Sequence, residues 1–78
     1  MRELRIQLRS VQDVLSFVAL ATERSFPIYV ANGNHRVNGE SFMEMFSLNL
    51  REPMVVTFQC SDEEYEKLRR DAARFAIE

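Results

Sequence analysis

Residues 4–23 read LRIQLRSVQDVLSFVALATE, and their hydrophobic period changes half-way. Up to Leu8 every second residue is apolar, and a period of two predicts a strand with one buried and one wet face. From Val11 the apolar residues recur at steps of three and four, which predicts an amphipathic helix to about Glu23. We therefore expect a strand followed directly by a helix that covers a sheet. The helix positions expected to be buried are Val11, Val14, Leu15, Val18 and Ala21, with Phe17 and Leu20 widening the apolar stripe.

Two turn signals follow this helix. Pro27 opens a short apolar stretch that ends at Ala31, and it fits a strand. The next three residues, Asn32-Gly33-Asn34, predict a tight turn because Asn and Gly adopt positive φ at low cost. A short antiparallel strand is expected over residues 35–37, and Asn38-Gly39 predicts a second turn after it.

The rest of the chain predicts two more helices around one strand. Residues 40–50 fit a short helix that ends near Leu48 or Asn49, and the β-branched stretch 53–60 fits a strand. Residues 61–76 are acidic at the front and basic behind, which suits the dipole of a helix at both ends.

The predicted element order is β-α-β-β-α-β-α, without linkers or repeats. We interpret residues 1–78 as one small α+β domain in which helices pack on a single face of a four-stranded antiparallel sheet. Hydrophobic residues make up 46% of the chain and charged residues 28%, a balance that is typical of a folded globular protein.

Charge and composition argue against several classes of function. The net charge is −2 and the basic residues are scattered, so the basic stripe of a nucleic-acid-binding protein is missing. The single cysteine and single histidine exclude an internal disulfide and a zinc-type ligand cluster, and we expect no metal and no cofactor. The chain starts with alternating polar and apolar residues, which argues against a signal peptide. It also lacks the roughly 20 consecutive apolar residues that a membrane span requires, so we expect a cytoplasmic protein.

Each predicted helix opens with a serine that is followed three residues later by an acidic residue. In such a capping box the serine hydroxyl accepts a hydrogen bond from the backbone N–H of the acidic residue, whose carboxylate accepts one from the serine N–H. Capping explains these serines without chemistry, whereas a serine nucleophile needs a base within hydrogen-bond reach. The three pairs are Ser10 and Asp13, Ser41 and Glu44, and Ser61 and Glu64.

The element order and residues 37–50, VNGESFMEMFSLNL, resemble the histidine-containing phosphocarrier protein (HPr) family of the bacterial sugar phosphotransferase system. In that family a Lys-Ser-type pair starts a short second helix, and Ser-Leu or Thr-Leu with a Gly or Asn follows it. The likeness spans nearly the whole chain. It implies an open-faced sandwich with three helices on one face of the sheet, and a protein partner that docks at the start of the first helix and on the second helix.

The resemblance also shows where this chain departs from the family. HPr proteins carry a phosphoryl group on a histidine at the start of the first helix, in a segment resembling Asn-Gly-Leu-His-Thr-Arg-Pro. Matching the first strand and Phe17 places Ser10 at that histidine and Gln12 at the following arginine. A phosphoserine ester is far less labile than a phosphoimidazole, and loss of the arginine removes a bidentate clamp on phosphate. We therefore expect no catalytic residue, and we expect His35, on the hairpin, to lie away from any helix N-terminus.

Ser41 matches a second feature of the family, a regulatory serine that a dedicated kinase modifies in some bacteria. Its spacing from Ser10 is the one that the resemblance predicts. Glu40 stands where the family has a basic or small residue, and a phosphate on Ser41 would be repelled by Glu40 and Glu44. This repulsion argues against phosphorylation of Ser41, which we keep only as an alternative.

The predicted second helix is apolar almost all round, although a helix on one face of a sheet buries only about half of its circumference. If Met45, Leu48 and Leu50 point inward, other apolar side chains of this helix must face water. An exposed apolar cluster often marks an interface; core packing in a thin domain and a homodimer are the alternatives. The residues expected at this surface are Phe42, Met43 and Phe46.

The leading hypothesis is a non-enzymatic HPr-like protein that acts as a protein-binding or regulatory module. Its partner would contact the start of the first helix and the second helix. The alternatives are a phosphotransferase-system component modified on Ser41 or Ser10, and a structural or dimerisation domain. The partner-binding residues in the leading hypothesis are Ser10, Gln12, Phe42, Met43 and Phe46.

Overall fold

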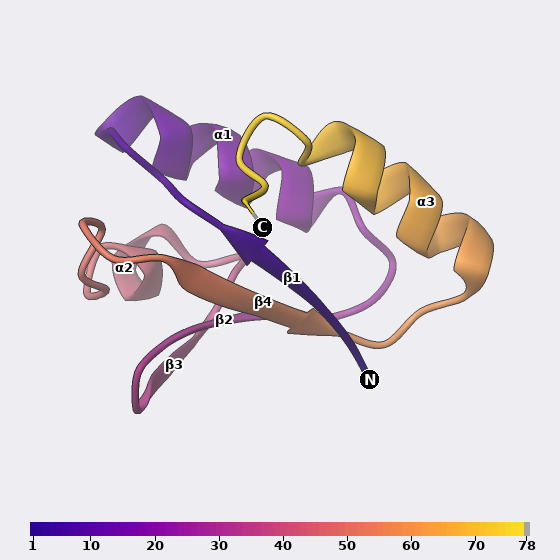
Figure 1. Ribbon diagram of the computed structural model, residues 1–78, viewed down its shortest axis with the longest axis horizontal. Helices are drawn as coiled ribbons and strands as arrows, with labels where there is room; N and C mark the ends of the chain where they lie inside the picture. Colours follow the sequence, from indigo (N-terminus) through magenta and orange to yellow (C-terminus); the bar gives the residue numbers. More distant parts are fainter. Residues whose placement is uncertain (78) are drawn as a thin grey trace.

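The computed structural model describes residues 1–77 and contains one four-stranded sheet and three helices (Figure 1). The order β-α-β-β-α-β-α is the predicted one. The elements are β1 (Arg2–Ile6), α1 (Val11–Thr22), β2 (Ile28–Asn32), β3 (His35–Asn38), α2 (Phe42–Met45), β4 (Met54–Phe58) and α3 (Asp62–Asp71).

The strands lie in the order β1-β4-β2-β3, and every neighbouring pair is antiparallel. The register sets Leu4, Val56, Val30 and Val37 side by side across all four strands. Because alternate residues of a strand share a face, this row lies on the side of the sheet that the helices cover. In Figure 1, α1 and α3 lie over that face, and α2 lies beside α1 near β3. The predicted open-faced α+β sandwich is confirmed.

The core lies between this sheet face and the two long helices. Phe17 of α1 meets Phe75 edge to face, with ring centroids 6.2 Å apart, and both side chains are buried. On the sheet side, Phe58 stacks with Tyr65 of α3 at a centroid distance of 5.9 Å. These contacts join α1 to the segment that follows α3, and α3 to the sheet.

The β2–β3 hairpin has the tight turn that the sequence predicts. Asn32 and His35 form the last pair of the ladder, so the loop contains two residues. Gly33, the first of them, has a φ of 62°, a conformation that a type II′ hairpin turn needs and that glycine adopts without strain.

The buried stripe of α1 differs from the predicted one. Its buried residues are Val14, Phe17, Val18 and Ala21. Val11 and Leu15, which we expected to be buried, are 58% and 39% exposed. Phe17 takes the inward position because it packs on Phe75, and this contact turns the flank that carries Val11 and Leu15 towards solvent.

Two helices are shorter than predicted. Helix α2 ends at Met45 instead of near Leu48 or Asn49, because the next amides bond three residues back rather than four: Ser47 N donates to Glu44 O at 3.0 Å. The Ser47 hydroxyl donates to the same carbonyl at 2.5 Å and stabilises this tight turn.

Helix α3 ends at Asp71, and the chain then returns to β1. Gln7 N donates to Phe75 O at 2.8 Å, and Ile77 N donates to Arg5 O at 2.9 Å. The last described residues thus cover part of the outer edge of β1, which would otherwise present unpaired backbone groups (Figure 1).

Candidate functional site

All three helix-opening serines are caps, as predicted. Each hydroxyl accepts a hydrogen bond from the backbone N–H three residues later, at distances between 3.1 and 3.3 Å. The reciprocal bond of a complete capping box is present only in α3, where Ser61 N donates to Glu64 Oε1 at 3.0 Å. The prediction of a complete capping box at α1 and α2 is therefore wrong.

The acidic residues of α1 and α2 have other partners. Asp13 Oδ2 accepts from Arg9 N at 2.9 Å, one residue before the cap. Glu44 Oε1 accepts from Asn38 N at 3.1 Å and ties α2 to the end of β3. Neither carboxylate accepts a hydrogen bond from the N–H of its own cap.

The start of α1 is already occupied by groups of this chain. The Ser10 hydroxyl accepts from Asp13 N, and the Asp13 carboxylate beside it lies 3.7 Å from the guanidinium of Arg74. A carboxylate at this position satisfies the positive end of the helix dipole. A phosphate placed on Ser10 would meet this negative charge.

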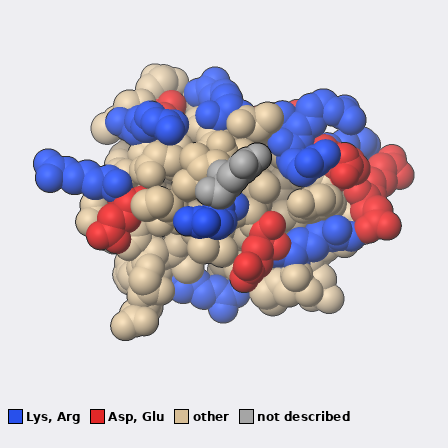
Figure 2. All heavy atoms as spheres, in the orientation of Figure 1, with Lys and Arg blue, Asp and Glu red and all other residues tan. Residues whose placement is uncertain are grey.

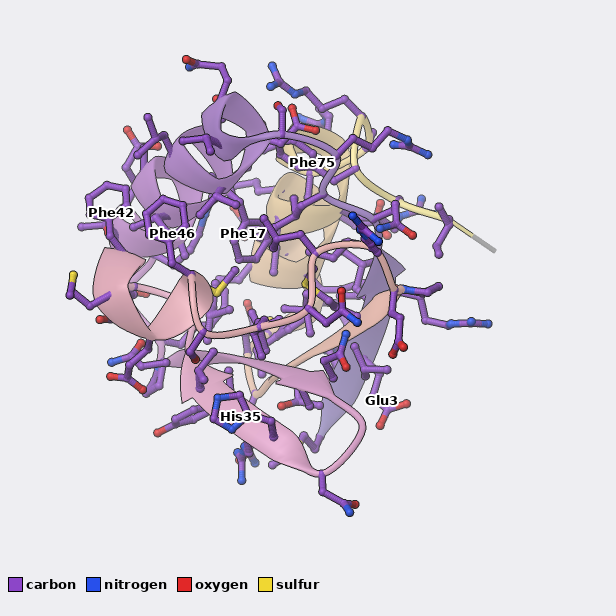
Figure 3. All side chains as sticks on the ribbon, turned by 90° about the vertical axis from the view of Figure 1, so that its left-hand side faces the viewer. Glu3, Phe17, His35, Phe42, Phe46 and Phe75 are labelled. Atoms are coloured by element: carbon purple, nitrogen blue, oxygen red, sulfur yellow. The ribbon has the colours of Figure 1, made fainter. Side chains whose placement is uncertain are left out.

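His35 lies on β3 and is exposed. Its Nε2 is 2.8 Å from Ser47 Oγ, and because the single hydroxyl proton of Ser47 goes to Glu44 O, the histidine nitrogen is the donor. Figure 3 shows His35 on the strand side of α2, whereas Phe42 and Phe46 lie on the side towards α1. The imidazole therefore bonds beyond the end of α2 and not at the start of α1.

Helix α2 and the turn that follows it divide their apolar side chains between core and solvent. Met45 and Leu48 are buried. Phe42 and Phe46 are each 44% exposed, and Met43 is 83% exposed. The expected exposure of these three side chains is observed, and in Figure 3 the two phenylalanines lie side by side next to α1.

Two residues of α1 extend this apolar surface. Asp13 and Phe17, four residues apart, face the end of α3 through Arg74 and Phe75. Val11 and Leu15 each precede one of them by two residues, and two residues of a helix turn by about 200°, so they lie on the opposite flank. Helix α2 contacts α1, and Figure 3 shows Phe42 and Phe46 on the side of α1 away from Phe75, hence on the flank of Val11 and Leu15.

We name the resulting patch the α1–α2 surface. It contains five of the seven exposed large apolar side chains of residues 1–77, and Ser10 and Gln12 lie at its edge. The surface consists of Val11, Leu15, Phe42, Met43 and Phe46.

Sequence reasoning missed Val11 and Leu15, because it placed both in the buried stripe. The available signal was the width of that stripe, since the apolar positions of residues 11–21 cover more of the helix than one sheet face can bury. The periodicity alone did not indicate which edge of the stripe would be exposed.

Cys60 is half-buried at the end of the sheet. Burial raises the pKa of its thiol, an effect that outweighs the nearby Arg2 guanidinium. Cys60 packs against the core as a partly buried apolar residue.

Other kinds of site find little support in the described part of the chain. Within residues 1–77 no three side chains of the metal-ligating types gather in one place. No described helix has the length and apolar character required to cross a bilayer. On the face seen in Figure 2, blue and red side chains are interspersed, with both signs over α3.

Solved structures share this whole arrangement. HPr-C-His from Thermoanaerobacter tengcongensis superposes with a TM-score of 0.76 at 26% sequence identity, over 95% of this chain and 92% of that one. The chain has the HPr-like fold. Phosphocarrier protein HPr from Bacillus anthracis has the same fold, with a TM-score of 0.64 at 24% identity over 90% of the HPr-like chain and 94% of its own. No protein-family model matches the sequence of this chain, and no curated protein matches it either.

Proposed function

We propose that this HPr-like protein is a cytoplasmic, bacterial, non-enzymatic module of the sugar phosphotransferase system. It binds a protein partner through the α1–α2 surface and carries no phosphoryl group on histidine. The observation that carries the proposal is the exposure of five large apolar side chains on α1 and α2, at the end of the fold where the resemblance places the docking face of the family.

The chemistry at the start of α1 supports the loss of phosphotransfer. Ser10 takes the position that the resemblance assigns to the phosphohistidine, and its hydroxyl is a helix cap. Gln12, at the position of the family arginine, has no charge to neutralise a phosphate. The only imidazole of the chain bonds to Ser47 instead.

The composition of the α1–α2 surface supports a protein partner. Phenylalanine and methionine are enriched at interfaces, where large, adaptable apolar side chains bury much area. Phe42 and Phe46 are about half exposed, so each is anchored on the fold and still offers area to a partner. Residues at such a boundary can gain further burial on docking without any change of fold.

The test of phosphotransfer uses the purified protein with phosphoenolpyruvate and the general enzyme of the phosphotransferase system. We expect no acid-labile label on the protein, while an HPr phosphocarrier in the same mixture becomes labelled. Acid-labile label that disappears in a His35→Ala variant would contradict the proposal. A His35→Gln variant serves as the matched control for folding, since Nε2 of Gln can also donate to Ser47.

Modification of a serine is the first alternative, and a separate experiment addresses it. Ser41 caps α2 through Glu44 N at 3.3 Å and lies beside Phe42, so a phosphate there would change the docking surface. Intact-mass analysis of protein from its own host under several nutrient states measures this directly. A stable phosphoester on Ser41 or Ser10 would favour a regulator switched by a kinase.

Self-association is the second alternative. A stable dimer buries roughly 800 Å² per partner, and the α1–α2 surface would be its apolar centre. Sedimentation of the purified protein distinguishes the two cases: a monomer leaves the surface free for another protein, and a dimer that dissociates in a Phe46→Ser variant assigns the surface to a second copy.

A further inference from the structure

A hollow of about 440 Å³ lies just before the start of α1. Its walls are the segment that leads from β1 into α1 and the segment that leaves α2. These two walls are joined, because Gln7 Nε2 donates to Leu50 O at 2.9 Å. The lining residues are Gln7, Leu8, Arg9, Leu50 and Arg51.

Two arginines give this hollow a positive charge. Arg9 and Arg51 are exposed, and among residues 1–77 no carboxylate lies within 4.0 Å of either guanidinium. Four arginines of the described chain are paired, among them Arg24 with Asp71 at 2.6 Å and Arg2 with Asp62. Arg5, Arg36 and Arg70 also form no ion pair with a described residue, but none of them lines this hollow. The guanidinium groups of the hollow thus have free donors, which match carboxylate and phosphate oxygens in geometry and charge.

The acidic neighbour of the pair does not neutralise it. Glu52 follows Arg51 directly, but the contact it makes with the hollow is through its backbone, with Glu52 O 3.4 Å from Gln7 Nε2. Its carboxylate forms no ion pair within the described chain. Asp13 is likewise engaged by Arg9 N, the backbone and not the side chain of that arginine.

The position of the hollow connects it to docking. Arg9 immediately precedes Ser10 and Val11, and Leu50 and Arg51 continue the segment that carries Phe42 and Phe46. A protein that covers the apolar side chains would therefore extend over the hollow as well. Apolar contacts at the centre with charged contacts at the rim are the common arrangement of protein interfaces.

We propose that the Arg9–Arg51 hollow receives an anionic group of the docking partner, either a side-chain carboxylate or a phosphoryl group. This inference rests on the proposed function and specifies the chemistry of the partner: an apolar segment that ends in a negative charge. The guanidinium N–H groups donate hydrogen bonds to the oxygens of the anion, and no covalent bond forms.

Three peptides of identical apolar sequence test the inference, with phosphoserine, glutamate or serine at one position near the end. Each is titrated into ¹⁵N-labelled protein, and the arginine Nε–Hε and backbone signals are followed. We expect at least about fivefold tighter binding of an anionic peptide than of the serine peptide, with shifts at Arg9 and Arg51. Preference for phosphoserine over glutamate assigns a phosphoryl group, and equal binding of these two assigns any carboxylate-like anion.

Matched variants separate this site from general electrostatics. The double variant R9Q/R51Q should remove the preference for the anionic peptides. The control R5Q/R70Q changes the net charge equally but alters exposed arginines of β1 and α3, and it should retain the preference. Equal binding of all three peptides, absence of binding by both anionic peptides, or equal effects of the two double variants would overturn the inference.

The same titrations can contradict the proposed docking function without contradicting the anion site, and the reverse. If the anionic peptides shift Arg9 and Arg51 while a Phe42→Ser, Phe46→Ser variant binds every peptide as well as the wild type, the anion site stands and the apolar docking surface does not. If this variant weakens all three peptides equally and the anionic ones have no advantage, docking stands and the anion site does not.

Discussion

Helices α2 and α3 begin alike and then differ in almost every respect. Both start with a serine that caps the amide of a glutamate three residues later. Helix α3 continues for ten residues, closes its capping box and buries Leu68. Helix α2 ends after four residues and leaves Phe42, Met43 and Phe46 at the surface. The same start signal therefore opens one helix that supports the fold and one that presents a surface.

The charges of the two helices explain the difference. Helix α3 has acidic residues in its first turn and basic ones in its last, and Lys67 lies 3.7 Å from Glu63 on its exposed side. Such pairs and the favourable dipole stabilise a helix whose outer face is wet. Helix α2 has one acidic residue and no basic one within its span, and its outer face is apolar. We attribute that costly exposure to binding.

The largest effect is expected from removing the core contact of α3. Leu68→Ala leaves a cavity at a buried position and should lower the free energy of unfolding by about 2–5 kcal/mol. The control is Met43→Ala on α2, whose exposed side chain should change that free energy by less than about 0.5 kcal/mol. Urea unfolding followed by circular dichroism measures both. Equal losses in the two variants would break the distinction between the helices.

The second prediction concerns α2 alone. Replacing Phe42 and Phe46 together by serine should leave the protein folded, since both side chains are partly in solvent, and should weaken partner binding at least about tenfold. Thermal unfolding and a titration with the partner are the two measurements. Loss of a cooperative unfolding transition would instead assign both side chains to the core.

The two caps should contribute unequally. Ser61→Ala removes the acceptor of Glu64 N and leaves only the backbone half of the capping box, so it should cost about 1 kcal/mol of stability. Ser41→Ala removes one bond at a helix of a single turn and should cost about half of that or less. The comparison of their urea midpoints tests this, and a larger loss for Ser41→Ala would show that α2 supports the fold more than α3 does.

The smallest effect is a pH dependence in α3. The hydrogen bond from Ser61 N, and then that from Ser25, lowers the pKa of Glu64 below its ordinary value of 4.5. A carboxyl whose folded pKa is lowered stabilises the protein above its unfolded pKa, and this contribution is lost as the pH falls through the folded pKa. The wild type should therefore exceed Glu64→Gln in urea midpoint at pH 6, and the difference should shrink below about pH 4.5. A difference that stays constant with pH would exclude this carboxylate as its source.

The sequence predicted the fold well because its signals are local. The change of period at Ser10 and the turn at Gly33 each depend on a few neighbouring residues, and the element order follows from them. The length of α2 was mispredicted because Ser47 bonds the carbonyl of Glu44, a competition between turn and helix that hydrophobic periodicity does not report.

The candidate site was predicted in part. Phe42, Met43 and Phe46 were found because α2 has more apolar side chains than it can bury. Leu15 was missed, since which edge of α1 is exposed depends on the distant Phe75, which packs on Phe17. The Arg9–Arg51 hollow had no sequence signal, because it forms only when the two segments come together through Gln7.

The most direct test of the central claim is an amide-shift map of the ¹⁵N-labelled protein titrated with the general enzyme of the phosphotransferase system. The account predicts shifts at Val11, Leu15 and residues 42–46, with the signals of α3 unchanged. Shifts confined to α3 or to the open face of the sheet would contradict it.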